Sequence, residues 1–356
     1  MDKQELDKAI QKTVLKMAMD PKNTENYHDL AKYYAMDNQF EKVISVYESL
    51  LEIDPKDMST LLNLGSIWFY AKEYRKALKC FNEAMLVNPS NYLVYYNMGN
   101  TYAEMKNFAK ALHYYSRTLD FNSNDPEVYN AIALLYHDFE DFVEARAYYE
   151  KALSIDENNL TALIDLGNVC YKLFDYKNAL EYYNKVFKLA PTNKTVALCI
   201  ANTYNVLKDK ENAYKYFDKA ISLEGDNYKA YICYAISKSD FKEEKEAIEL
   251  YKKAIELNPQ EVNAYILLGN MYSNLKKYKE AEEQYREALK INKLDPSIYV
   301  LIANTYFMNN EVERSIFSYR AAVNLRPEND EYKLVFIQVL EDYMEESRKD
   351  DIVANF

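Results

Sequence analysis

Cysteine and histidine are the side chains in this sequence best suited to nucleophilic or metal chemistry. The four cysteines, Cys80, Cys170, Cys199 and Cys233, form no CxxC pair, and only three histidines accompany them. Because zinc needs about four such ligands close together, we expect no metal site. Cys170 and His137 could serve as a nucleophile and its base, but Cys170 falls in a recurring apolar column, which favours packing.

Glycine loops and carboxylate pairs could bind phosphate or act as acid and base, and both patterns are weak here. The glycines recur singly, at Gly65, Gly99, Gly167, Gly225 and Gly269. A phosphate-binding loop needs several glycines close together, so we expect no nucleotide cofactor. Asp138 with Asp141, and Glu243 with Glu244, lie among 56 acidic residues, and a solvated face explains them. We therefore expect a protein that is not an enzyme and uses no cofactor.

The elements that carry these residues repeat every 34 residues from Thr24 to Asn329. The eighth place of each repeat is always small, and the twenty-fourth is always aromatic. Residues at the eighth place are Ala31, Gly65, Gly99, Ala133, Gly167, Ala201, Ala235, Gly269 and Ala303. Residues at the twenty-fourth place are Tyr47, Phe81, Tyr115, Tyr149, Tyr183, Phe217, Tyr251, Tyr285 and Tyr319. A repeat of this period predicts a solenoid that presents an extended surface to a partner.

Each repeat carries two apolar runs with helical spacing, separated by a short polar turn such as Asp37 to Gln39. The pattern predicts two helices, with the small residue of the first making room for the aromatic residue of the second. All eight prolines lie at repeat boundaries. We expect Pro126 and Pro296 to begin a helix behind the N-caps Asp125 and Asp295.

These columns resemble the tetratricopeptide repeat family, which is marked by the same sequence of aromatic, small, alanine, aromatic and proline positions. The resemblance implies an all-α fold, a right-handed α-solenoid or superhelix of antiparallel helix pairs. The nine expected repeats span residues 24–57, 58–91, 92–125, 126–159, 160–193, 194–227, 228–261, 262–295 and 296–329. We expect residues 1–23 to form a capping half repeat, and residues 330–356 to form a capping helix and a short tail.

Composition predicts a protein that does not bind nucleic acid and does not insert into a membrane. The net charge is −12, with 44 basic and 56 acidic residues and no concentrated basic stripe. Phosphate backbones and anionic lipids would therefore not be attracted. No apolar run approaches the length of a membrane span, and the first residues lack the apolar core of a signal peptide. We expect a cytoplasmic protein with reduced cysteines.

The family resemblance places a partner-binding concave groove at the second, fifth, ninth, twelfth and thirteenth places of each first helix. The ninth place carries a row of five asparagines: Asn100, Asn168, Asn202, Asn270 and Asn304. A carboxamide both donates and accepts, so such a row could pair with the backbone of an extended peptide. The alternative is that these asparagines belong to the repeat consensus and bond to the neighbouring helix.

Groove positions also change character along the chain, from aromatic to carboxamide. The early and middle repeats contribute Phe69, Tyr70, Tyr96, Asn130, His137 and Tyr171, and the later repeats contribute Asn205 and Asn274. Aromatic residues are favoured anchors for a partner's side chains. No lysine occupies the fifth place, so the chaperone-tail carboxylate clamp of some family members is not supported.

We expect a scaffold or adaptor that binds an extended protein segment in this groove. Two alternatives remain open. The chain could be a non-catalytic subunit that delivers substrates to an enzyme, like the repeat arm of O-linked N-acetylglucosaminyltransferases. It could also be a structural array that forms homo-oligomers.

Overall fold

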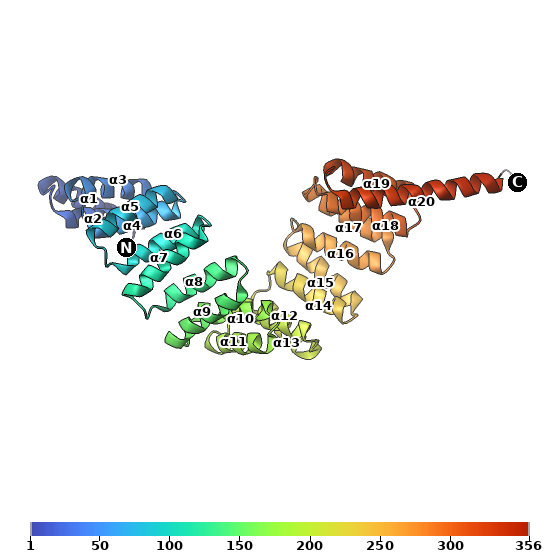
Figure 1. Cartoon of the computed structure of the whole chain (residues 1–356), viewed down its shortest axis with the longest axis horizontal. Helices are drawn as coiled ribbons and strands as arrows, with labels where there is room; N and C mark the ends of the chain where they lie inside the picture. The colour runs from blue at the N-terminus through green and yellow to red at the C-terminus, as the bar shows by residue number, and fades with distance from the viewer. Residues whose placement is uncertain (1, 355–356) are drawn as a thin grey trace. The chain divides into compact units, whose positions relative to one another are not determined.

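The structure is a computed structural model that describes residues 2–354, with side chains described up to residue 345. Residues 355–356 of the expected tail lie outside the described residues. The described chain contains twenty α-helices and no strands, and consecutive helices pack as antiparallel pairs (Figure 1). This architecture confirms the predicted all-α solenoid class.

Every repeat contributes a first helix of 13 residues. These helices are α2 (Thr24–Met36), α4 (Met58–Tyr70), α6 (Tyr92–Glu104), α8 (Pro126–Asp138), α10 (Leu160–Lys172), α12 (Lys194–Val206), α14 (Tyr228–Asp240), α16 (Val262–Asn274) and α18 (Pro296–Met308). Asp125 and Asp295 cap α8 and α18 by accepting backbone N–H bonds, and a proline occupies the first turn of both helices. The predicted role of Pro126 and Pro296 is therefore confirmed.

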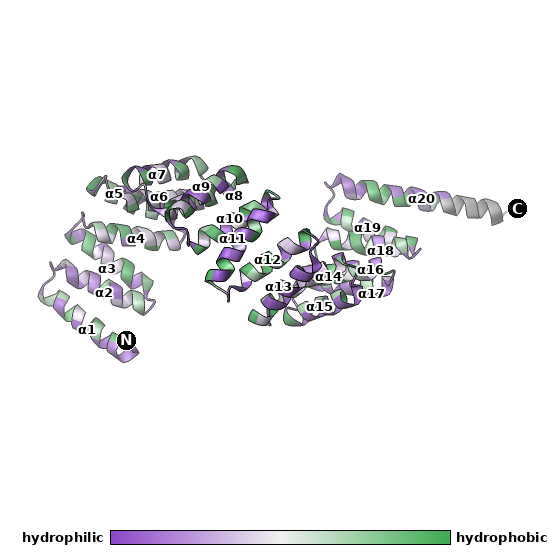
Figure 2. Cartoon of the chain, turned by 90° about the horizontal axis from the view of Figure 1, so that it is seen from below, coloured by the Kyte–Doolittle hydropathy of each residue, from purple (hydrophilic) through white to green (hydrophobic). Residues whose placement is uncertain are grey.

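The second helix of every repeat has 14 residues. These helices are α3 (Phe40–Ile53), α5 (Tyr74–Val87), α7 (Phe108–Phe121), α9 (Phe142–Ile155), α11 (Tyr176–Leu189), α13 (Lys210–Leu223), α15 (Glu244–Leu257), α17 (Tyr278–Ile291) and α19 (Val312–Leu325). Helix α1 (Lys3–Met19) precedes them, and α20 (Asp330–Ala354) follows them. Hydrophilic and hydrophobic residues alternate along the helices, as amphipathic packing requires (Figure 2).

The chain divides into two compact bodies, Met1–Lys185 and Val186–Phe356, here named the N-terminal and C-terminal bodies. In the N-terminal body, Ile10 and Met17 of α1 pack against the core that contains Tyr27 and Leu30. In the C-terminal body, Val339 of α20 packs against the core between α18 and α19. Both terminal helices thus add apolar contacts to the helix pair beside them.

The small residue at the eighth place is required by a close approach between the two helices of a repeat. A Cβ atom placed on Gly167 would lie 2.5 Å from Cε1 of Tyr183, a distance that side chains do not tolerate. Tyr183 and the other aromatic residues of this column are buried. The glycine notch therefore positions the second helix, and with it every side chain that faces the first helix.

The turn between the two helices contains a residue with a left-handed backbone in all nine repeats. These residues have φ between 55° and 65° and none is a glycine: Asn38, Lys72, Lys106, Glu140, Phe174, Lys208, Lys242, Lys276 and Asn310. A left-handed residue ends a helix by turning the chain back on itself. Helix packing thus overrides the local preference of lysine, glutamate and phenylalanine.

Candidate functional site

The first helices present a solvent-facing surface at the places that the groove prediction named. The second and thirteenth places are exposed in all nine repeats, whereas the fifth is partly or fully buried. This pattern follows from helix geometry, because places two, nine and thirteen share one side of a helix whose opposite side packs against its partner. The exposed side of the first helices is named the first-helix face.

The asparagine row lies along this face, but most of its oxygens bond within the protein. The Tyr115 hydroxyl donates to Asn100 Oδ1 at 2.7 Å, and the Tyr183 hydroxyl donates to Asn168 Oδ1 at 2.8 Å. Asn270 and Asn304 accept in the same way from the tyrosine fifteen residues later. These four bonds join the first helix of a repeat to its second helix, as the packing alternative requires.

The amide nitrogens of two asparagines also have partners in the same helix. Burial raises the pKa of Tyr96, and a hydrogen bond from Asn100 acts in the opposite direction. Burial likewise raises the pKa of Asp165, while nearby His137 and a hydrogen bond from Asn168 oppose this rise. Asn100 and Asn168 are therefore held at both ends of the carboxamide.

Two further predicted residues have internal partners in the C-terminal body. Asn205 donates to Asp240 at 3.1 Å and accepts from the Ser237 hydroxyl at 2.7 Å. Asn202 has phenylalanine rather than tyrosine at the twenty-fourth place of its repeat, and it bonds to the Cys233 thiol, whose pKa is raised by burial. These contacts join first helices of neighbouring repeats.

The aromatic end of the first-helix face contains a cavity of about 280 Å³ in the N-terminal body. Its walls come mainly from the first helices α4, α6, α8 and α10 of four consecutive repeats, and Tyr115 of the second helix α7 completes them (Figure 1). Four predicted groove residues line it, namely Phe69, Tyr96, Asn100 and Asn130. The structure thus brings together residues from three repeats that the sequence could only place in separate columns.

Polar groups without partners are concentrated in the fourth repeat, which contributes α8 to this cavity. Five buried side-chain N or O atoms of the described residues lack a hydrogen-bond partner, and four belong to Asn130, His137 and Tyr149. Asn130 is 6% exposed, and neither its oxygen nor its nitrogen is paired. Because an unpaired buried polar group costs about 1–3 kcal/mol, this repeat departs from the well-satisfied pattern of its neighbours.

The charged residues that line the cavity are mainly acidic. Four carboxylates line it, at Glu104, Glu127, Asp138 and Asp165, together with the single ammonium group of Lys106. Lys106 lies 3.3 Å from Asp138, so one carboxylate is neutralised by an exposed ion pair. Three acidic groups therefore remain without a cationic partner in the lining.

The repeat architecture can be compared with known families. Models of the tetratricopeptide repeat match residues 92–158, 126–192, 200–227, 229–261, 250–283 and 296–329, and a model of the TPR repeat matches residues 269–310. Together these matches cover more than half of the chain. The chain belongs to the tetratricopeptide repeat (TPR) family.

Solved structures show the same TPR fold. A tetratricopeptide repeat protein from Parabacteroides merdae is 17% identical, with a TM-score of 0.56 over 70% of this chain and 98% of its own. The Cut9–Hcn1 hetero-tetramer of the APC/C is 16% identical, with a TM-score of 0.50 over 89% of this chain and 64% of that chain. This chain therefore spans less than two thirds of that one. Pseudomonas aeruginosa pilF is 20% identical, with a TM-score of 0.50 over 62% of this chain and 97% of its own. No curated protein sequence matches this chain.

The remaining predicted groove residues of the TPR array lie outside the cavity lining. Tyr70 is 82% exposed and contacts Phe69 edge to face, with ring centroids 5.4 Å apart. His137 packs edge to face on Phe142, and Tyr171 does so on Tyr176. Asn274 is exposed at the end of α16 in the C-terminal body. These side chains belong to the first-helix face without sharing one site.

Cys170 and His137, considered from the sequence as a nucleophile and its base, do not form a catalytic pair in this TPR chain. Cys170 is fully buried, and burial raises its thiol pKa to about 11. Arg146 opposes that rise, and no hydrogen bond joins Cys170 to His137 in the described part of the chain. A thiol with this pKa is protonated at neutral pH, whereas the nucleophilic form of cysteine is the thiolate. Within the described residues, no cluster of three metal-ligating side chains occurs.

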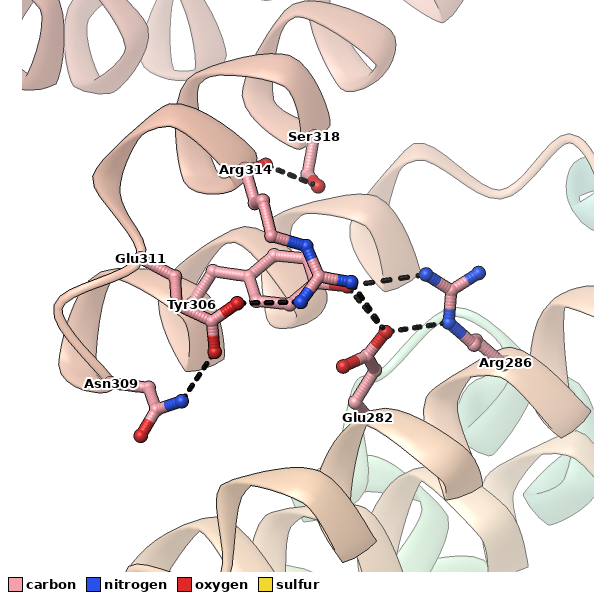
Figure 3. Close-up of polar contacts among 7 residues, drawn as sticks. All are labelled: Glu282, Arg286, Tyr306, Asn309, Glu311, Arg314 and Ser318. Carbon is pink, nitrogen blue, oxygen red and sulfur yellow. Dashed lines mark hydrogen bonds and ion pairs between the residues drawn. The ribbon is translucent and has the colours of Figure 1, made fainter.

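A second polar cluster, which the sequence columns did not reveal, lies in the last two TPR repeats. Figure 3 shows Arg286 and Arg314 converging on Glu282 beside Tyr306. Arg286 Nε donates to Glu282 at 2.7 Å and its Nη2 donates to Tyr306 at 3.2 Å. Arg314 also pairs with Glu311 and lies 4.2 Å from the Tyr306 ring centroid. Both arginines are thus engaged within the protein, so this cluster stabilises the helix stack.

Among the described residues, no helix is long and apolar enough to cross a membrane.

Lys238, which replaces an aromatic residue in the seventh TPR repeat, is also accounted for by packing. Its ammonium group lies 2.6 Å from Glu243 and 3.9 Å from the Tyr214 ring centroid. Lys238 therefore forms an internal ion pair that covers the Tyr214 ring.

Proposed function

We propose that this TPR chain is a non-enzymatic scaffold or adaptor that binds an extended segment of a partner protein along the first-helix face. The TPR fold supports protein–protein interaction in general. The cavity beside Asn130 is the observation that carries the finer proposal. Asn130 lines this cavity, and its buried oxygen and nitrogen have no partner among the described residues.

We also propose that the protein works in the cytoplasm. Cys80, Cys170 and Cys233 are free thiols, and Cys80 and Cys170 are buried. Free cysteines are typical of proteins kept in a reducing compartment.

A photo-crosslinking experiment tests the proposed binding face. A photoreactive phenylalanine analogue is introduced at Tyr70 on the first-helix face or, as a matched control, at Leu86 on the second helix α5. These side chains are 82% and 80% exposed, so accessibility is equal. After irradiation in lysate of the source cells, crosslinked peptides are identified by mass spectrometry.

We expect the Tyr70 probe to capture one partner segment and the Leu86 probe to capture none. A synthetic peptide of that segment should compete with the crosslink. Capture at Leu86 alone, or at both sites equally, would overturn the proposal, because the partner would then contact the second helices.

A further inference from the structure

We propose that the cavity beside Asn130 receives an arginine side chain of the bound partner segment. This inference rests on the proposed function and adds the chemistry that the first-helix face recognises. It follows from three features of the cavity: its charge, its aromatic walls and its unpartnered carboxamide.

The charge of the lining selects a cation. Glu104, Glu127 and Asp165 have no cationic partner among the lining residues, since Lys106 pairs with Asp138. Asp165 is partly buried, and its pKa is raised by burial. A guanidinium group close to this carboxylate would stabilise its charged form, because opposite charges interact strongly where water is excluded.

The aromatic walls favour arginine over lysine. Phe69 and Tyr96 line the cavity on α4 and α6. A planar guanidinium can lie flat against such a ring while its edge donates hydrogen bonds to carboxylates. A lysine ammonium is more strongly hydrated and offers only three donors from a single point, so it fits this combination of ring and carboxylates less well.

Asn130 supplies the polar contact that neither charge nor aromatic rings provide. It is the only carboxamide at the fifth place among the nine repeats, where most residues are apolar. Both polar atoms are buried, so binding requires the side chain to rotate into the cavity. Its oxygen can then accept a bond from the guanidinium, and its nitrogen can donate to a backbone carbonyl of the same segment. Binding would thus pair both groups of a side chain that has no partner within the protein.

Saturation-transfer NMR with small probes tests this inference without the partner protein. The probes are N-acetyl-arginine amide, its uncharged analogue N-acetyl-citrulline amide, and N-acetyl-lysine amide, each added to the full chain at low salt. We expect the arginine probe to receive saturation and the other two to receive at least threefold less.

Two variants link the signal to the cavity. Asn130→Leu and Asp165→Asn should each weaken arginine-probe binding by about tenfold, as the loss of one charge-assisted bond implies. Asp29→Asn is the matched control, because Asp29 occupies the sixth place of the first repeat, as Asp165 does in the fifth, and lies outside the cavity. Asp29→Asn should leave binding unchanged.

Equal signals from the arginine and citrulline probes, or full binding by Asp165→Asn, would overturn the arginine inference. A signal from the lysine probe equal to that from the arginine probe would overturn the preference of the cavity for a guanidinium. Because the probes need no partner, these results are independent of the crosslinking experiment. A crosslinked segment without arginine-probe binding would leave the scaffold proposal standing and remove only this inference.

Discussion

One tyrosine column offers a sharp test of the hydrogen-bond pattern, because the same substitution should have opposite effects in adjacent repeats. Tyr149 and Tyr183 occupy the twenty-fourth place of the fourth and fifth repeats, and both are at most 2% exposed. The Tyr183 hydroxyl donates to Asn168 at 2.8 Å, whereas the Tyr149 hydroxyl has no partner. Replacing each tyrosine by phenylalanine removes only that hydroxyl.

The expected magnitudes follow from these contacts. Tyr183→Phe removes a bond with a net value of about 1 kcal/mol, so we expect the free energy of unfolding to fall by that amount. Tyr149→Phe removes a buried unpaired hydroxyl, whose desolvation costs about 1–3 kcal/mol, so we expect stability to rise. The two variants should therefore differ by about 2–4 kcal/mol.

Urea unfolding followed by circular dichroism measures this difference, provided that the m-values of the variants agree. Long repeat arrays can unfold in more than one step, so hydrogen exchange of the amides in α9 and α11 gives a local check. The reasoning is refuted if Tyr149→Phe destabilises the protein as much as Tyr183→Phe does.

A double-mutant cycle identifies the cause. Leu134 occupies the place where the fifth repeat has Asn168, and it is 50% exposed. Leu134→Asn should supply an acceptor to the Tyr149 hydroxyl and stabilise the chain that keeps Tyr149. In the Tyr149→Phe background, Leu134→Asn should give no such stabilisation, so the coupling energy between the two substitutions should be about 1 kcal/mol.

Three further predictions concern the notch, the turns and an ion pair. Gly167→Ala should destabilise by about 1–3 kcal/mol in urea unfolding, since its Cβ would meet the Tyr183 ring; no loss would contradict the notch. Phe174→Gly should stabilise by about 1 kcal/mol, because φ is 61° there; a lower melting temperature would contradict this. Lys210 and Lys238 lower the Glu243 pKa to about 2, so its stabilisation is present above about pH 4.5 and lost as pH falls toward 2. Between pH 5 and pH 3, the free energy of unfolding of Glu243→Gln should therefore fall by about 1 kcal/mol less than that of the wild type. Equal falls would argue against the ion pairs of Glu243 with the two lysines.

Most of the fold could be predicted from the sequence, because the repeat enforces the same local pattern nine times. Small and aromatic columns predicted the contact between Gly167 and Tyr183 correctly. The left-handed turn residues could not be predicted from residue type, since Lys72 and Phe174 have no preference for positive φ. There, tertiary packing of the two helices decides the backbone conformation.

The asparagine row shows where sequence reasoning stopped short of an available signal. Each of Asn100, Asn168, Asn270 and Asn304 is followed fifteen residues later by a tyrosine, whereas Asn202 is followed by Phe217. This pairing follows the observed hydrogen bonds. Reading the two columns together would have favoured packing over peptide binding for the asparagine oxygens.

The cavity could not be predicted, because its lining comes from five helices of four consecutive repeats and depends on how they stack. Its position nevertheless has a sequence correlate in the fourth repeat. Asn130 replaces a mostly apolar column, and Leu134 replaces a mostly polar one, so the polar group has moved one helical turn along α8. That exchange leaves Asn130 and Tyr149 unpaired, and with His137 they account for four of the five unpaired buried polar atoms among the described residues. Packing alone would have favoured the consensus residues at these places, and we therefore propose that a bound partner pairs the polar groups of this repeat.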